Sequence, residues 1–75
     1  MAARDRLLRR SLRERFVVTM HSRESFDGLL LEVDDRTLTM VNATALNGQD
    51  RVKVDGTLYL PRGEVAYMQK PEASG

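Results

Sequence analysis

The sequence predicts an all-β domain, built as one strongly bent five-stranded barrel with an α-helix in front of it. Three observations carry this prediction. From Phe16 onward, short apolar runs alternate with polar residues, as in strands that have one covered face. Turn residues separate these runs at short intervals. Gly28 lies inside the second run, and an internal strand glycine usually marks a bend or bulge that lets a small sheet curl over.

The size of the chain limits how it can be stabilised. Its 75 residues allow one domain. At this size, apolar burial at roughly 25 cal/mol per Å² about offsets an ordering cost of roughly 1.5 kcal/mol per residue. The sequence contains no cysteine and one histidine, His21, so it offers neither a disulfide nor a clustered metal site. We therefore expect no metal and no cofactor, and we expect self-association to complete the fold.

The first predicted element is a helix over about residues 3–15. This segment lacks glycine, proline and β-branched residues, and it is rich in arginine, leucine and alanine, which are good helix formers. Leu8, Leu12 and Phe16 recur every four residues and form one narrow apolar stripe, so we expect the helix to lie on the barrel through the two leucines. Residues 1–15 hold six arginines and two acidic residues, a net charge of +4, whereas residues 16–75 hold six basic and nine acidic residues, a net charge of −3.

Five strands are predicted after the helix, followed by a polar tail. The strands cover residues 16–21, 26–33, 37–45, 51–60 and 65–69, the barrel covers about residues 16–70, and the frayed tail covers residues 71–75. Asn47-Gly48 predicts a hairpin, because both residue types tolerate positive φ. Asp55-Gly56 interrupts the fourth strand and is expected to kink it. The proline and glycine of residues 61–63 predict a tight turn.

Two motifs in this order carry a family resemblance. Gly28, Leu30, Val33 and Asp34 place a glycine in the second strand, a leucine two positions on, and a hydrophobic residue followed by aspartate. Residues 58–63, Leu-Tyr-Leu-Pro-Arg-Gly, end a hydrophobic strand in Arg-Gly. With a helix in front, these motifs resemble the Sm-like family (Sm, LSm, archaeal Sm-like proteins and bacterial Hfq), and in particular a divergent bacterial or phage-type member.

The resemblance covers roughly residues 5–70 and implies both an architecture and an assembly. It implies an SH3-like barrel capped by the N-terminal helix. It also implies a closed homo-oligomeric ring, in which the strand at residues 51–60 of one subunit pairs with the strand at residues 65–69 of the next. Tyr59 and Tyr67 lie on these two strands, so interface packing is their expected role.

Single-stranded RNA binding by that ring is the leading function that the resemblance implies. The RNA-binding residues carried over from the family, or suggested by the basic helix face, are Asp34, Arg36, Leu38, Arg62, Gly63, Arg6, Arg9 and Arg13. In many family members, an aromatic residue or histidine and then an asparagine bind a uracil after the aspartate. Arg36 and Leu38 occupy those positions here. Arginine can stack on a base, but leucine cannot hydrogen-bond a base edge.

Each of these residues also has a structural interpretation. Arg62 either contacts RNA at the inner rim of the ring or hydrogen-bonds the loop that holds Asp34. Asp34 itself is expected mainly to fix that loop, because a carboxylate there repels phosphate. Arg6, Arg9 and Arg13 either form a positive crown on one ring face or make up an ordinary solvated helix face.

The sequence also allows functions other than RNA binding. The principal alternative is a protein-interaction or scaffold ring that has lost base-specific RNA recognition. Membrane binding by the basic helix is disfavoured because its apolar stripe is narrow. No nucleophile with a paired base, metal cluster or glycine-rich phosphate loop is found, so no enzyme activity, catalytic residue or small-molecule substrate is expected. Without a signal peptide or a long apolar run, a cytoplasmic location is expected.

Overall fold

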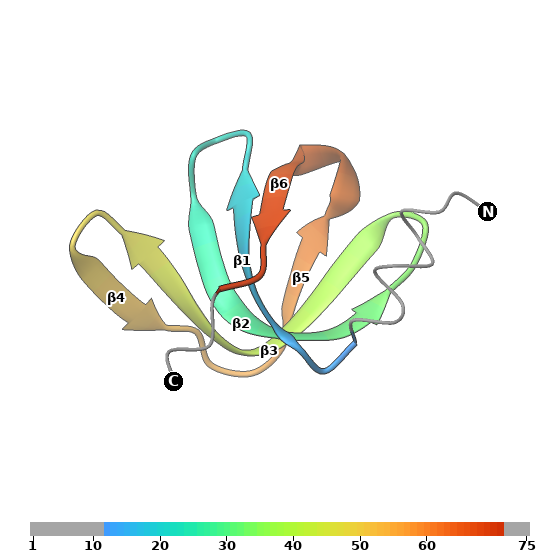
Figure 1. Cartoon of the computed structure of the whole chain (residues 1–75), viewed down its shortest axis with the longest axis horizontal. Helices are drawn as coiled ribbons and strands as arrows, with labels where there is room; N and C mark the ends of the chain where they lie inside the picture. The colour runs from blue at the N-terminus through green and yellow to red at the C-terminus, as the bar shows by residue number, and fades with distance from the viewer. Residues whose placement is uncertain (1–11, 72–75) are drawn as a thin grey trace.

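The computed structural model describes residues 12–71, in which six antiparallel strands form one curled sheet (Figure 1). The elements are β1 (Arg15–Met20), β2 (Ser25–Val33), β3 (Thr37–Asn47), β4 (Asp50–Lys53), β5 (Leu58–Pro61), the 3-10 helix η1 (Arg62–Glu64) and β6 (Val65–Gln69). The strand order is β4-β3-β2-β1-β6, and β5 pairs with β3. The prediction of an antiparallel β fold is confirmed.

The predicted bend in the second strand is confirmed at Gly28. A Cβ atom at this position would lie only 2.9 Å from the Cα atom of Ala43 and 3.1 Å from its Cβ atom. The register of β2 and β3 shifts here, and Asn42 has a left-handed φ of 52°. Glycine is therefore required because β3 comes too close to β2 for any side chain.

The predicted fourth strand, residues 51–60, is wrong as a single strand. Gly56 has a φ of 77°, which breaks the extended backbone between β4 and β5. Both pieces nevertheless lie along the same edge of β3. β4 pairs with residues 44–47 of β3, and β5 pairs with residues 37–40. The predicted hairpin at Asn47-Gly48 is confirmed, with Gly48 at a φ of 64°.

The sheet curls without closing within residues 12–71. β6 pairs with β1 and β5 pairs with β3, but β5 and β6 do not pair with each other. η1 connects these two strands directly (Figure 1). Each of them therefore offers one edge of unpaired backbone groups.

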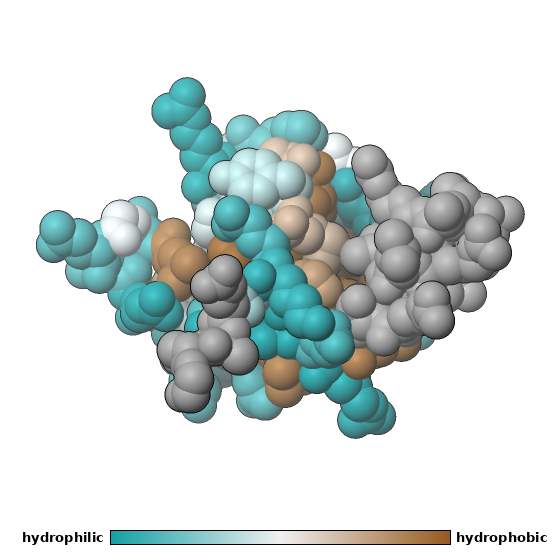
Figure 2. All heavy atoms as spheres, viewed as in Figure 1, coloured by the Kyte–Doolittle hydropathy of each residue, from teal (hydrophilic) through white to brown (hydrophobic). Residues whose placement is uncertain are grey.

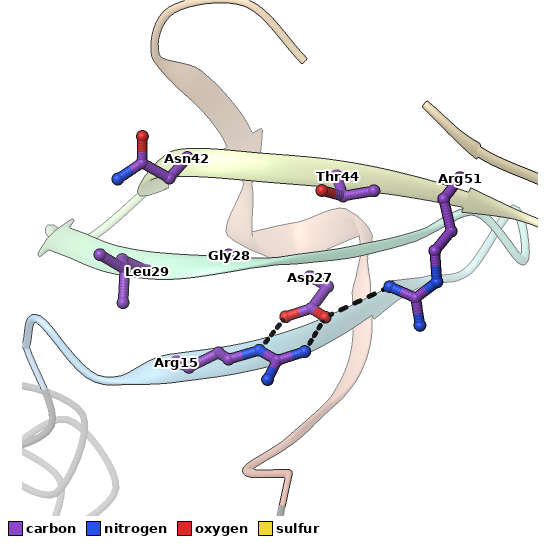
Figure 3. A pocket seen from close by; sticks show the side chains of 7 residues that line it. All are labelled: Arg15, Asp27, Gly28, Leu29, Asn42, Thr44 and Arg51. Carbon is purple, nitrogen blue, oxygen red and sulfur yellow. Dashed lines mark hydrogen bonds and ion pairs between the residues drawn. The ribbon is translucent and has the colours of Figure 1, made fainter. Parts of the chain in front are cut away.

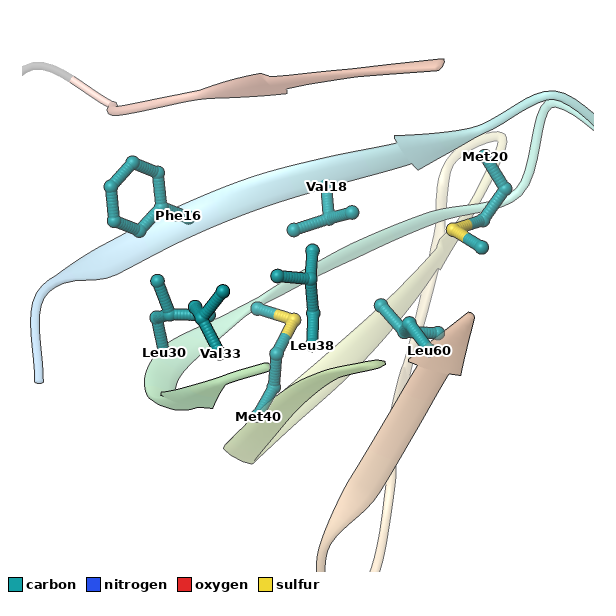
Figure 4. Close-up of a cluster of buried hydrophobic side chains, with 8 residues drawn as sticks. All are labelled: Phe16, Val18, Met20, Leu30, Val33, Leu38, Met40 and Leu60. Atoms are coloured by element: carbon teal, nitrogen blue, oxygen red, sulfur yellow. The ribbon is translucent and has the colours of Figure 1, made fainter. Parts of the chain in front are cut away.

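The hydrophobic core lies inside the curl and is lined by alternate residues of the strands (Figure 4). Its buried members are Phe16, Val18, Met20, Leu30, Val33, Leu38, Met40 and Leu60. Three of them come from every second position of β1, which is the period of a strand with one covered face. Leu12, in the turn before β1, is partly buried against the same cluster.

The start of the described chain differs from the predicted helix boundary. Residues 12–14 form a turn, Arg13 has a left-handed φ of 69°, and Arg15 already belongs to β1. The backbone carbonyl of Glu14 accepts a hydrogen bond from the backbone N–H of Leu30 at 2.9 Å, which extends the pairing with β2. The predicted helix therefore does not reach residue 15, and its earlier part lies outside the described residues. Between residues 12 and 71, no helix is long and apolar enough to cross a membrane.

Candidate nucleic-acid interface

Two turns that are far apart in the sequence meet at one end of the sheet. The first is the turn over residues 34–36, between β2 and β3, and the second is η1, after β5. Pairing of Thr37 with Pro61 brings them together. Arg62 then joins them twice: its Nη1 donates to the carbonyl of Asp34 at 2.7 Å, and its backbone N–H donates to the carbonyl of Arg36 at 2.8 Å.

The carboxylate of Asp34 holds the first turn in shape. Its Oδ1 atom accepts the backbone N–H of Arg36 at 2.8 Å and that of Thr37 at 2.7 Å. These backbone hydrogen bonds are the main reason why the pKa of Asp34 lies below its usual value, and the charges of Arg62 and Arg36 lower it further. The geometry agrees with the loop-fixing role that the sequence favours for this residue.

Arg36 combines a fixed backbone with an exposed side chain. Both its N–H and its carbonyl are hydrogen-bonded, whereas its side chain lies at the surface. Residues 34–37 line an open depression of about 510 Å³. Gly63 is exposed on the adjoining turn, and an added Cβ atom there would meet nothing within 4 Å. The joined turns therefore present an open surface that a strand of nucleic acid can approach.

Two other predicted RNA-binding residues are described, and neither belongs to the joined turns. The side chain of Leu38 is 1% exposed and packs in the core, so it does not reach the surface of the joined turns. Arg13 is exposed in the turn before β1. Arg6 and Arg9 lie outside the described residues. The structure thus brings together Asp34, Arg36, Arg62 and Gly63.

Sequence reasoning missed a second polar cluster, which centres on Asp27 of β2. Asp27 is only 6% exposed. Its carboxylate accepts hydrogen bonds from Arg15 Nε at 2.7 Å and from Arg15 Nη2, and Arg51 Nη1 lies 3.8 Å from its Oδ2 atom. The hydrogen bonds from Arg15 lower the pKa of Asp27 despite its burial. The alternation along β2 predicts that the side chain of Asp27 lies on the face of the sheet away from the core. Its partners on the neighbouring strands can be identified only from the register of strand pairing.

Large apolar side chains are exposed at the two unpaired strand edges. Tyr59 of β5 is 67% exposed and Tyr67 of β6 is 55% exposed. Figure 2 shows a largely hydrophilic surface in which apolar residues emerge near the middle and along the lower edge of this face. Exposed tyrosines beside free backbone groups are typical of a surface that pairs with another chain.

Comparison with known proteins places this geometry in context. No protein-family model and no curated protein sequence matches the chain. Solved structures do match. A chain of the SmAP1 heptamer of P. aerophilum superimposes on this chain with a TM-score of 0.87 at 18% identity. The match covers 97% of this chain and 99% of the SmAP1 chain. The protein has the Sm-like fold. The expected similarity in fold is thereby confirmed.

Two further neighbours with this fold come from different settings. The Sm protein of Pyrococcus abyssii, solved in complex with a uridine heptamer, has a TM-score of 0.80 at 19% identity, over 95% of this chain and all of that one. A chain of the NatC complex bound to CoA has a TM-score of 0.77 at 18% identity, over 87% of this chain and 84% of that one. The Sm-like fold thus occurs both in an RNA complex and in a protein complex.

Proposed function

We propose that the protein forms a closed homo-oligomeric ring that binds single-stranded RNA at its joined turns. The observation that carries the proposal is the pair of hydrogen bonds from Arg62 to the turn over residues 34–36. They hold the backbone of Arg36 in place while its guanidinium stays at the surface. A preorganised arginine of this kind loses little entropy on binding a phosphate or stacking on a base.

Assembly into a ring multiplies this weak contact. The unpaired edge of β5 in one subunit meets the unpaired edge of β6 in the next, with Tyr59 and Tyr67 packed at the boundary. Every subunit then contributes one copy of the joined turns around a shared pore, so individually weak phosphate contacts add up. Neighbours described as heptamers support this part of the proposal.

The N-terminal segment supplies a second basic surface. We place a single domain over the chain, with a helix before Leu12 that carries Arg6 and Arg9. Together with Arg13, which is exposed, these arginines add positive charge on one face of the ring. The proposed RNA contacts are therefore Arg36, Arg62 and Gly63 at the pore and three arginines beside it, with Asp34 holding the turn.

Titration of labelled oligo-U and oligo-A at two salt concentrations tests the proposal. Affinity should fall steeply with salt, because phosphate contacts release counterions. Arg36→Gln should weaken binding by roughly tenfold or more. Arg23→Gln is the matched control, since Arg23 is an exposed arginine in the turn between β1 and β2. Equal losses in both variants, or an intact ring without affinity for either oligonucleotide, would overturn RNA binding at the joined turns.

A protein-scaffold ring is the second candidate function. Two observations favour it: Leu38 is buried and so cannot read a base, and a neighbour with this fold belongs to the NatC complex. Under this alternative, Arg62 serves only to join the turns. The same titration distinguishes the two functions, because a scaffold keeps its native mass and shows no salt-dependent affinity for RNA.

A further inference from the structure

A polar pocket lies over the first half of β2, on the face of the sheet away from the core (Figure 3). It has a volume of about 230 Å³ and is lined by Arg15, Asp27, Gly28, Leu29, Asn42, Thr44 and Arg51. The bend at Gly28 and the bulge at Asn42 shape its floor. Figure 3 shows Arg15 and Arg51 reaching toward Asp27 from different strands, with Thr44 on β3 between Asn42 and Arg51.

The charges of this pocket do not cancel. Arg15 satisfies the carboxylate of Asp27 with a two-pronged hydrogen bond. Arg51 approaches the same carboxylate only to 3.8 Å, which is beyond hydrogen-bonding distance. Its side chain is 65% exposed. Two cations therefore flank one anion, and the guanidinium of Arg51 is drawn over the pocket while its N–H donors remain available among the described residues.

We propose that this pocket is a phosphate-binding subsite, distinct from the proposed RNA surface at the joined turns. Arg51 is its main ligand and the hydroxyl of Thr44 is a neutral second donor. Asp27 is a positioning residue, because it aims Arg51 without touching the anion. A guanidinium fork matches the oxygen atoms of a phosphate, and the pocket is smaller than those that enclose a whole drug-sized ligand, about 300–1,000 Å³.

Titration with inorganic phosphate at constant ionic strength tests the subsite without RNA. The NMR signals of the Arg51 guanidinium and of Thr44 should shift and saturate in the assembled protein. Arg51→Gln should weaken phosphate binding by about tenfold or more, which is the value of a charge-assisted hydrogen bond. Lys53→Gln is the control for Arg51→Gln. It removes one positive charge from β4 at an exposed residue that does not line the pocket, and it should change the affinity for phosphate less than about twofold.

Two further variants separate a built subsite from general charge attraction. Thr44→Val removes the hydroxyl without changing charge, and it should weaken phosphate binding by a few-fold. Arg36→Gln should leave the phosphate-dependent shifts of the Arg51 and Thr44 signals unchanged while it weakens RNA binding at the joined turns, so failure of the proposed RNA function is distinguishable from failure of this inference. Signals that do not saturate, or equal losses in Arg51→Gln and Lys53→Gln, would overturn the subsite.

Two more ligands in the same assay distinguish the two possible sources of the phosphate, a free metabolite and an RNA strand. If a nucleoside 5′-monophosphate binds this pocket as tightly as a short RNA does, the ligand of the pocket is a free phosphorylated metabolite. If a short RNA shifts the same signals at a much lower concentration than the nucleoside monophosphate does, the ligand is the phosphodiester backbone of an RNA strand. Both results support the subsite, and in both Arg51→Gln should weaken the binding that shifts the Thr44 signal by about tenfold or more.

Discussion

Gly28 shows how much of the curl depends on a single residue. A Cβ atom at this position would lie only 2.9 Å from the Cα atom of Ala43, and that atom belongs to the backbone of β3. A flexible side chain can move aside, but a paired strand can yield only by losing its register. The bend, the bulge and the pocket on the outer face therefore share one origin.

Gly28→Ala should lower the free energy of unfolding by about 1–3 kcal/mol, because overpacking against a backbone forces the strand to shift. Urea denaturation at a fixed protomer concentration measures the change. Gly63→Ala is the control, since its added Cβ atom would meet nothing within 4 Å. We expect its effect to stay within about 0.5 kcal/mol. Similar losses in both variants would contradict the close approach at Gly28.

Asp27 should make the fold sensitive to acid. Its pKa is lowered in the folded protein, so its contribution to stability is complete above the unfolded value of about 3.9 and is lost as the pH falls through the lower folded value. Asp27→Asn should cost about 1–3 kcal/mol at neutral pH, because Arg15 loses its charged partner. It should also flatten the dependence of stability on pH in the acid range. Urea denaturation as a function of pH measures both effects.

The control for acid sensitivity is Asp35→Asn, which changes an exposed aspartate in the turn after β2. It should follow the wild-type curve. An Asp27→Asn curve that also matches the wild type would show that the ion pair between Arg15 and Asp27 contributes no stability.

The sequence predicted elements better than it predicted their ends and partners. Alternation located the strands because one face of each packs on the core, and glycines located the bend and the hairpin. At Asp55-Gly56 the sequence indicates only a kink, because the alternation of apolar and polar residues continues across the break between β4 and β5. The helix propensity of its neighbours favours a helical Arg15, but pairing with β2 outweighs that propensity in the structure.

The candidate site was only partly predictable for a similar reason. A motif identified the turn after β2 and the arginine after β5, because both lie at fixed positions along the chain. Which role Arg62 plays depended on its distance from the carbonyl of Asp34, which only the folded geometry supplies. The cluster around Asp27 had no motif, since its partners come from β1 and β4 through the sheet register.

The turn after β2 can be tested as an element. Asp34→Ala removes the acceptor of two backbone N–H groups, so we expect lower stability and weaker RNA binding by a less ordered Arg36. Asp34→Asn keeps one acceptor oxygen and should retain more of both. Denaturation and RNA titration measure the two effects. If Asp34 acted through its charge alone, both variants would bind RNA more tightly, and that result would contradict the loop-fixing role.

The state of assembly is the property of the whole molecule on which the proposed function rests. Tyr59→Glu or Tyr67→Glu places a charge at an edge that we expect to be covered, so either variant should reduce the native mass from a ring to smaller species. Native mass spectrometry and light scattering at micromolar concentration report the change. Leu31→Glu is the control, because Leu31 is 38% exposed but lies on β2, inside the sheet order. A wild-type protein that stays a single chain at this concentration would exclude the ring.

The brevity of η1 has a geometric consequence for stoichiometry. Only three residues separate the two free edges, so the angle between the edges is set within one rigid subunit. When copies join edge to edge, the same angle repeats at every junction. The ring closes only if this angle divides a full rotation evenly. Lengthening η1 by one residue should therefore change how many copies complete the circle, or convert it into an open spiral, while leaving each subunit folded.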